Sequence, residues 1–202
     1  MSEQHICLSP EVPASREEHA TSDRTKHTSS STSSVWDISH CRDEYCVYTN
    51  EGFGGQGISL ITTELSYHRV REFQASEPAS RPSYEKIRVE SIPGKGKGLV
   101  TTKMIHRGER LTAAKPALLV HRNAFMELEP EDVYNLIDVA VDSLEPSRRA
   151  SYVAQAGTMG GHKNTDILFT NSFQLSIGDH DDGFHYGNFP EISLLNHDCR
   201  PK

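Results

Sequence analysis

Apolar and polar residues alternate along several short stretches of the chain, and these stretches predict β-strands. The clearest is 86–92, KIRVESI, where apolar residues alternate with charged or polar ones as in a half-buried strand. Two runs of β-branched, aromatic and other apolar residues, 46–49 and 58–63, flank the glycine-rich stretch 51–57, which predicts strand, loop and strand. Further strands are expected at 99–102, 110–113, 117–120 and 172–177.

A helical repeat replaces this alternation between residues 130 and 144. Pro130 suits the first position of a helix, and the two acidic residues after it suit the positive end of the helix dipole. A second helix is expected to begin with Ser147 as its cap and to end by Gly157. The apolar stripe of the first helix consists of Val133, Leu136, Ile137, Ala140, Val141 and Leu144.

Polarity and proline content divide the chain into four parts. Residues 1–34 are rich in Ser and Thr and should form a disordered tail, because ordering costs about 1–2 kcal/mol per residue without apolar burial in return. A lead-in segment with short strands is expected at 35–73, and a proline-containing linker at 74–83. Residues 84–202 then form the main domain, with loops at 158–164 and 178–187, and the whole predicts an α+β fold.

Composition narrows the class of partner. The 202 residues carry a net charge of -7, which disfavours duplex nucleic acid because no broad basic field can neutralise phosphates. The first residues contain no apolar run typical of a secretory signal, and no run is long enough to span a bilayer. We therefore expect an intracellular protein, nuclear or cytoplasmic, that does not bind membranes. The sequence does not indicate an oligomeric state.

The four cysteines form no C-x-x-C pair, so a zinc ribbon or a thioredoxin-type site is not predicted. Cys41 and Cys46 could close a small disulfide loop in an oxidising compartment, but without a signal peptide two thiols are expected. Cys199 beside His197 could act as a thiol nucleophile, although no third group is evident to orient the base. A buried, structural Cys199 is the preferred interpretation.

An Asp-rich loop at 178–183 suggests calcium, but it does not fit an EF-hand. Counted from Asp179, the sixth and twelfth positions hold Phe184 and Pro190, where that motif needs glycine and glutamate. His180 and His185 could pair as metal ligands, but histidines are scattered through the whole chain. A solvated loop without metal is the preferred interpretation.

Two further motifs could carry chemistry. The turn at 92–99, IPGKGKGL, lets the backbone approach a ligand closely, although by itself it is typical of a turn between strands. The cluster at 196–201, NHDCRP, follows the apolar pair Leu194 and Leu195. An apolar strand leading into such a cluster would hold a site on a rigid support, and a capped turn would look similar.

Together these two motifs resemble the SET domain. IPGKGKGLVTTKMIHRGERL is similar to the opening of that family, and TNSFQLSIGDHDDGFHYGNFPEISLLNHDCRPK is similar to its later part. Residues 129–157 stand where the family carries a helical insert, and CRDEYCVYTNEGFGGQGISLITT is similar to the lead-in of fungal members. The resemblance covers 36–202 and is nearest to SMYD-like and fungal SET-domain proteins, without a cysteine-rich MYND module.

The resemblance implies transfer of a methyl group from S-adenosylmethionine to a lysine of a protein, histone or otherwise. The family holds this cofactor with the glycine turn and with the Asn-His pair, and it lines the lysine channel with an aromatic residue, here Phe173. Close positioning and exclusion of water would supply much of the rate. The implied cofactor-binding residues are Lys95, Lys97, Gly98, Leu99, Asn196 and His197.

The sequence departs from the family at its end. The catalytic tyrosine of the family would lie beyond Lys202, and Tyr186 does not take its place, so we expect a truncated member. Cys199 matches one ligand of a structural zinc site whose other ligands are missing, so zinc is not expected. A non-catalytic SET-like binding module is the alternative. A metal- or thiol-based interaction protein built on Cys41, Cys46 and the histidines is a third, weaker hypothesis.

Overall fold

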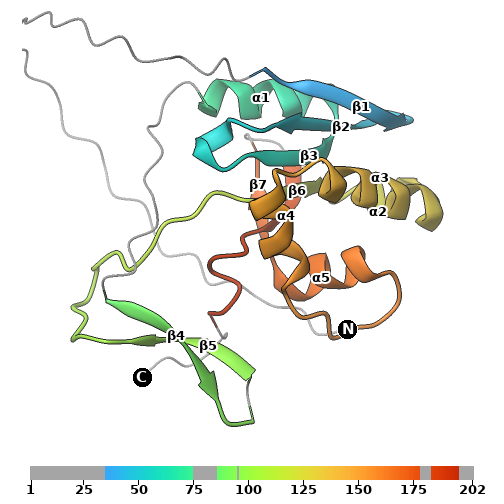
Figure 1. Cartoon of the computed structure of the whole chain (residues 1–202). Coiled ribbons are helices and arrows are strands. Elements are labelled where there is room, and N and C mark those ends of the chain that lie inside the picture. Colours follow the sequence, from blue (N-terminus) through green and yellow to red (C-terminus); the bar gives the residue numbers. More distant parts are fainter. Residues whose placement is uncertain (1–34, 75–85, 95, 178–182, 196–202) are drawn as a thin grey trace, which may run out of the picture. The chain divides into compact units, whose positions relative to one another are not determined.

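Six strands pair into one mixed β-sheet, whose strand order is β1-β2-β3-β6-β8-β7 (Figure 1). A computed structural model describes residues 35–74, 86–94, 96–177 and 183–195, all of which belong to one unit, residues 32–202. The strands of the sheet are β1 (Asp37–Arg42), β2 (Tyr45–Asn50), β3 (Ile58–Thr62), β6 (Leu118–His121), β7 (Ser172–Ser176) and β8 (Phe184–Asn188).

A separate two-stranded sheet, five α-helices and one short 3-10 helix complete the described part of the chain. This mixture of helices and a largely antiparallel sheet confirms the predicted α+β class. The second sheet consists of β4 (Ile87–Ile92) and β5 (Gly96–Thr101). The helices are α1 (Glu64–Gln74), α2 (Ala124–Glu127), α3 (Pro130–Asp142), α4 (Pro146–Val153) and α5 (Lys163–Asn171), with η1 at Phe53–Gly55.

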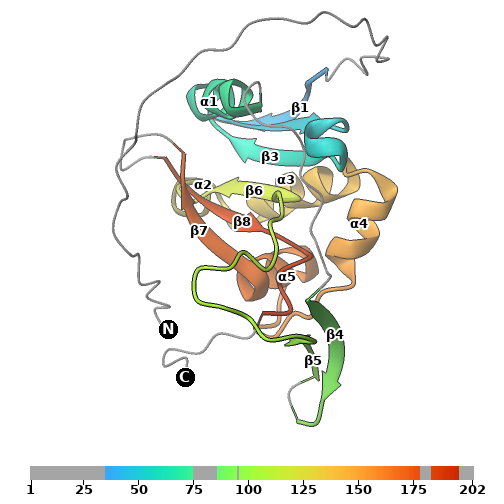
Figure 2. The ribbon, with the colours of Figure 1, turned by 90° about the vertical axis from the view of Figure 1, so that its left-hand side faces the viewer.

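The six-stranded sheet is built from two antiparallel groups joined by one parallel pair. Strands β1, β2 and β3 follow each other as an antiparallel meander, and β6, β8 and β7 form the other group. Strands β3 and β6 run parallel, with Ser59 opposite Leu118 and Ile61 opposite Val120. Figure 2 shows β3, β6 and β8 side by side in the middle of the sheet.

Each face of this sheet is covered by its own apolar cluster. On one face, Val47, Ile61 and Val120 pack against the apolar stripe of α3 and against residues of α4 and α5. On the other face, strand residues such as Leu60 pack with Tyr67 of α1 and with residues of η1. Burial of both faces explains why β3 and β6 read as continuous apolar runs rather than as alternating ones.

The two central helices agree with the sequence pattern, apart from one cap. Helix α3 begins at Pro130, and its predicted stripe is buried. Helix α4 begins at Pro146, one residue before the predicted cap, so Ser147 lies inside the helix. The carboxylate of Glu145 caps it by accepting hydrogen bonds from the backbone N–H groups of Ser147 and Arg148.

Other elements differ from the prediction. Residues 110–113 form no strand. The expected polar loop at 178–187 contains β8, whose polar His185 is buried because it lies between two strands. Helix α5 begins inside the stretch expected as a loop, and α1 was not predicted. Helix α1 was missed because only a few of its residues face the sheet, which leaves a weak apolar stripe.

The glycine turn at 92–99 joins β4 and β5 into a hairpin, in agreement with the strand–turn–strand pattern. Ile92 lies opposite Gly96, and the strands pair antiparallel from there to Ile87 and Thr101. Gly94 and Gly96 both have φ of 73°. This left-handed backbone is strained for residues with a Cβ, so the turn requires glycine at these positions.

A second hairpin, β1–β2, overturns the expectation of two free thiols. Asp43 adopts a left-handed backbone at the tip, and the turn places Cys41 directly opposite Cys46. Their Cα atoms are 4.1 Å apart, and a disulfide joins the two residues. Direct cross-strand pairing gives the proximity that a disulfide needs, and the sequence spacing by itself did not reveal this register.

Replacing Ile137 with alanine should lower the free energy of unfolding by about 3 kcal/mol, because its fully buried side chain lies in the middle of the α3 stripe. Urea denaturation monitored by circular dichroism measures the change. Met126→Ala is the control, since this side chain is 73% exposed and should cost little. Equal losses in the two variants would contradict the placement of α3 against the sheet.

Candidate functional site

Lys97, Gly98 and Leu99, three of the residues that the resemblance assigns to the cofactor, lie on β5. The backbone N–H of Leu99 donates a hydrogen bond of 3.3 Å to the carbonyl oxygen of Leu194. Leu194 stands just before the NHDC motif. The structure therefore joins the glycine-turn strand to the segment that leads into the second motif.

The direction of this bond tells which backbone groups β5 presents on its outer edge. In an antiparallel strand, the N–H and C=O of one residue point to the same side, and the next residue points to the opposite side. Because Leu99 points away from β4, Lys97 presents its N–H and C=O on the same edge. This edge offers donors and acceptors at two-residue intervals.

The segment before the NHDC motif consists of turns and not of the expected apolar strand. The N–H groups of Ile192 and Ser193 donate to the carbonyl oxygen of Phe189, and Leu195 donates to Ile192. These local bonds replace the strand pairing that the apolar pair Leu194 and Leu195 suggested. Half of the Leu195 surface is exposed, at 49%, so the pair does not enter the core as a unit.

A buried ion pair holds this turn segment against the helical layer. Arg148 on α4 is only 3% exposed, and its guanidinium donates to the Glu191 carboxylate and to the carbonyl oxygen of Lys115. Breaking such a pair from one side leaves an uncompensated buried charge, which typically costs several kcal/mol. The pair therefore tethers the turn segment, and the sequence did not point to it.

Four of the residues that the resemblance assigns to a site lie outside the described part of the chain. These are Lys95, Asn196 and His197 of the implied cofactor site, and Cys199 of the implied zinc remnant. His180 of the candidate metal pair also lies outside it. The assignments of these residues stay predictions.

Phe173, the expected channel residue, lies on β7 opposite Gly187 of β8. Its ring makes an edge-on contact with Phe189, with centroids 6.0 Å apart. A Cβ on Gly187 would approach the side chains of Leu175 and Phe189 to 2.6 and 3.0 Å, so the close packing here requires glycine. Phe173 thus stands at the start of the turn segment, and its role in a channel stays a prediction.

His185 lies at the centre of a buried polar group that the sequence analysis did not identify. Its Nδ1 donates to the carbonyl oxygen of Gly183 at 2.8 Å, so its Nε2 accepts from the Thr62 hydroxyl at 2.7 Å. The His121 ring stands edge-on to it, with centroids 4.7 Å apart. Burial above all, and also the nearby His121, lower the pKa of His185 to about 4, so the ring is neutral.

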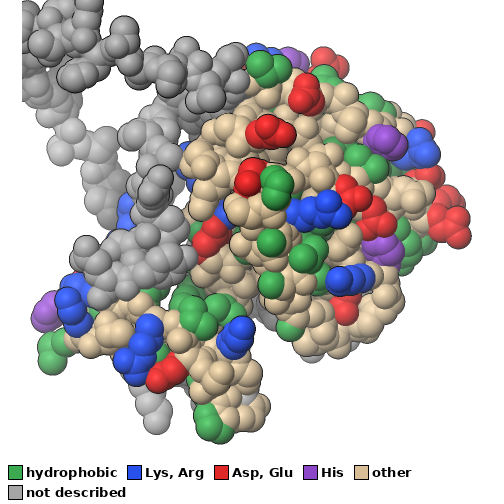
Figure 3. Space-filling view, viewed as in Figure 1, with side chains coloured by type: hydrophobic (Ala, Val, Ile, Leu, Met, Phe, Trp, Pro, Cys, Tyr) green, Lys and Arg blue, Asp and Glu red, His purple; other side chains and the backbone are tan. Residues whose placement is uncertain are grey.

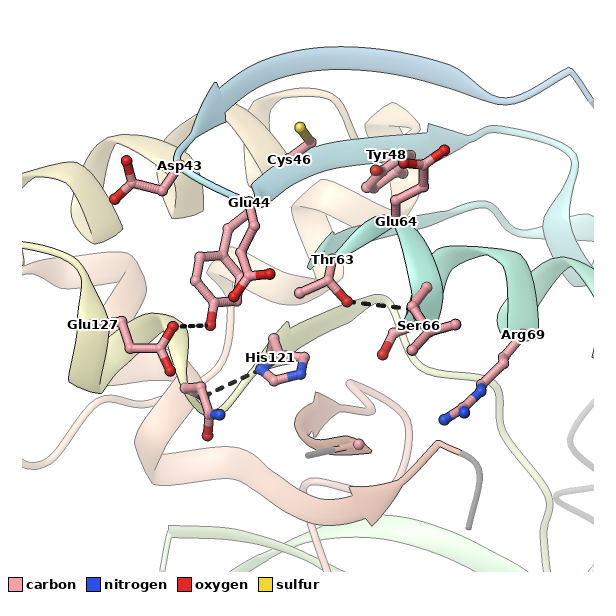
Figure 4. Close-up of a pocket in the computed structure, with 14 residues that line it drawn as sticks. Asp43, Glu44, Cys46, Tyr48, Thr63, Glu64, Ser66, Arg69, His121 and Glu127 are labelled. Atoms are coloured by element: carbon pink, nitrogen blue, oxygen red, sulfur yellow. Dashed lines mark hydrogen bonds between the residues drawn. The ribbon is translucent and has the colours of Figure 1, made fainter. Parts of the chain in front are cut away.

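A cavity of about 700 Å³ opens beside this polar group (Figure 4). It is bounded by the tip of the β1–β2 hairpin, the start of α1, the end of β6 and helix α2. The residues that line it are Asp43, Glu44, Tyr45, Cys46, Tyr48, Thr63, Glu64, Leu65, Ser66, Arg69, His121, Asn123, Glu127 and Gly183.

Carboxylates converge on one phenol at one end of this cavity. The Tyr45 hydroxyl donates a hydrogen bond to the Glu127 carboxylate at 2.5 Å. Burial, and then the carboxylates of Glu127 and Glu44, raise the pKa of Tyr45 far above its usual value. Tyr45 is therefore a neutral donor and not a base.

Metal ligation is not favoured by the described residues. Among them there is no group of three or more His, Cys, Asp or Glu side chains that could hold a metal ion. His185 has both ring nitrogens engaged by protein groups, so within this structure it is not available as a ligand. In the described part of the chain, no helix is long and apolar enough to cross a membrane.

Lys and Arg side chains of the described residues are scattered among Asp and Glu on the face shown in Figure 3. Comparisons of the chain with models of known protein families, with curated proteins and with solved structures gave no match.

The buried neutral His185 predicts a loss of stability in acid. Its pKa is lower in the folded than in the unfolded chain, so its contribution is complete above about pH 6.5 and is lost as the pH falls toward 4. Protonation of His185 should therefore lower the free energy of unfolding by about 2 kcal/mol between pH 7 and pH 5. Urea titrations at the two pH values measure it.

His185→Gln should remove most of this pH dependence, because the amide keeps hydrogen-bonding capacity without titrating. His106→Ala is the control, since His106 is exposed and should leave the pH dependence as in the parent chain. A parent-like slope in the His185 variant would show that other groups cause the acid sensitivity.

Proposed function

We propose that this chain is a SET-type protein that binds S-adenosylmethionine, of the class that methylates lysine side chains of proteins. The observation that carries the proposal is the hydrogen bond from Leu99 to Leu194. It joins the two segments whose motifs, far apart in the sequence, resemble the cofactor-binding parts of that family. A chance similarity of two short motifs would not require them to meet.

The exposed edge of β5 supports a cofactor held through the backbone. Gly94 and Gly96 have open space where a Cβ would stand, so the turn offers its backbone without steric cover from described side chains. Lys97 presents both of its backbone polar groups on the same edge as Leu99. When bound, S-adenosylmethionine would supply the methyl group. The backbone of β5, with Asn196 and His197, would orient it.

Phe173 would help to enclose the target lysine. An aromatic wall excludes water, which favours the neutral amine that attacks the methyl carbon. Phe189 packs edge-on against Phe173 and would keep its ring in place. None of the described residues is assigned the role of the family's catalytic tyrosine, so cofactor binding, and not turnover, is the property to test.

A non-catalytic binding module is the second candidate. The observation in its favour is the cavity of about 700 Å³, whose lining includes none of the residues assigned to the cofactor or to the lysine channel. A protein that recognises a ligand there would need neither the glycine turn nor Phe173.

Calorimetric titration of S-adenosylmethionine into the purified chain should give saturable binding with one site per chain. His197→Ala should weaken it at least about tenfold, the usual effect of losing a hydrogen bond to a charged or strongly polar group. His106→Ala makes the same chemical change just after β5 at an exposed position and should bind as the parent does.

Absence of binding by a folded chain, shown by a cooperative urea transition, would overturn the proposal for these residues and favour the binding module. Equal weakening by His197→Ala and His106→Ala would also contradict the proposal, because it would show that binding does not depend on the NHDC motif. S-adenosylhomocysteine, which lacks the methyl group and its sulfonium charge, should compete for the same site.

A further inference from the structure

The cavity beside His121 is lined by four carboxylates, Asp43, Glu44, Glu64 and Glu127, and by the guanidinium of Arg69. Glu64 lies on the Arg69 side (Figure 4), and its carboxylate is 3.5 Å from Nε2 of His68. Glu44 and Glu127 stand at one end next to the Tyr45 hydroxyl, and Arg69 stands at the other (Figure 4). Both glutamate side chains are exposed at the rim of the cavity. Arg69 uses one guanidinium nitrogen on the carbonyl oxygen of Ile177 and keeps further N–H groups on the same fork.

Ser66 adds a hydroxyl group to the lining of the same cavity. The residue is only 4% exposed, and its backbone N–H donates a hydrogen bond to the Thr63 hydroxyl. A serine hydroxyl can both donate and accept a hydrogen bond, so it could contact either polar end of a ligand.

Two tyrosines contribute to the lining of the cavity. Tyr45 and Tyr48 are both buried phenols, but they belong to the clusters on opposite faces of the sheet, and the Tyr48 ring is stacked on Tyr67. Burial raises the pKa of Tyr48, as it does that of Tyr45, so both rings stay neutral at ordinary pH. Neutral aromatic rings attract cations and cover an alkyl chain well.

A metal ion does not fit this arrangement, because the described side chains provide no group of three ligands for it. The charge pattern instead fits an elongated organic cation, with an ammonium group at the end that holds Glu44 and Glu127. The opposite end favours a carbonyl oxygen, which Arg69 can bind as a donor. A lysine in a peptide has both groups, whereas a free polyamine has no carbonyl.

We propose that this cavity binds the lysine side chain of a peptide, with the ammonium group between Glu44 and Glu127 and a backbone carbonyl oxygen of the peptide at Arg69. The Tyr45 ring covers the methylene chain, and the Ser66 hydroxyl adds a polar contact. This site lies outside the residues assigned to methyl transfer. The inference therefore holds or fails independently of the proposed cofactor binding.

The test is a titration of the blocked tripeptide acetyl-Gly-Lys-Gly-amide into the ¹⁵N-labelled chain, followed by two-dimensional NMR. Binding should saturate with a Kd of about 1 mM or tighter, and the largest shifts should fall on the amides of Thr63, Ser66 and Asn123. The same peptide with an acetylated lysine should bind at least about tenfold more weakly, because it lacks the charge.

Glu127→Gln should weaken binding by about tenfold, since the amide keeps the contact with Tyr45 but not the charge. Glu44→Gln should act in the same direction and carries little risk of unfolding, because this side chain is exposed. Glu72→Gln, an exposed acid that does not line the cavity, removes one charge and should leave the Kd unchanged.

No saturable shift with the lysine peptide would overturn the proposal. So would equal binding of the acetylated peptide, or equal weakening by Glu127→Gln and Glu72→Gln, which would indicate a general charge effect. The same titration is repeated with spermidine. If spermidine binds and the peptide does not, the ligand is a free polyamine and not a peptide.

Discussion

The parallel pairing of β3 with β6 is the contact on which the rest of this structure depends. The register of the pair places Leu60 beside Leu119 and Ile61 beside Val120. A hydrogen bond of 3.0 Å from the backbone N–H of Ser59 to the carbonyl oxygen of Ala117 extends the pairing. Alternate residues of this pair belong to the two apolar clusters. Loss of the pair would separate the N-terminal meander from the later strands and open both faces to water.

Polar groups inside this frame decide where sites can form. Thr62 at the end of β3 and His185 on β8 lie on different strands, and only the completed sheet brings them together with His121. In the same way, Arg148 on α4 reaches Glu191 because α4 packs on the sheet. Each group is tolerated because its charge or dipole has a partner, and truncation of either partner would leave the other unsatisfied.

The two proposed sites use different physical means. The edge of β5 would bind a ligand through backbone N–H and C=O groups. The hydrogen bond from Leu99 to Leu194 connects this edge to the segment that precedes the NHDC motif. The cavity offers charge at Glu44 and Glu127 and aromatic cover at Tyr45, so it selects by electrostatics. A protein that handles lysine side chains would have use for both, and each is testable without the other.

Local patterns predicted much of the secondary structure. The helical stripe of α3 and the β-type runs of β2 and β3 are local properties, and the structure confirms them. Strand β4 also forms where it was predicted, but the half-buried face was wrong, because Val89 is 52% exposed. Predictions were wrong or missing where local signals were weak. Examples are the polar strand β8, the turns at Leu194 and the helix α1, because burial against neighbours and not local preference determines each of them.

The sequence by itself determined the α+β class, the glycine turn and the motif resemblance, since these reside in residue types and short spacings. The tertiary structure decided the rest: the Cys41–Cys46 disulfide, the neutral His185 and the charged cavity at Glu127. Each of these depends on contacts between residues on different elements. Their energies come from burial and cross-strand register, which no short stretch of sequence contains.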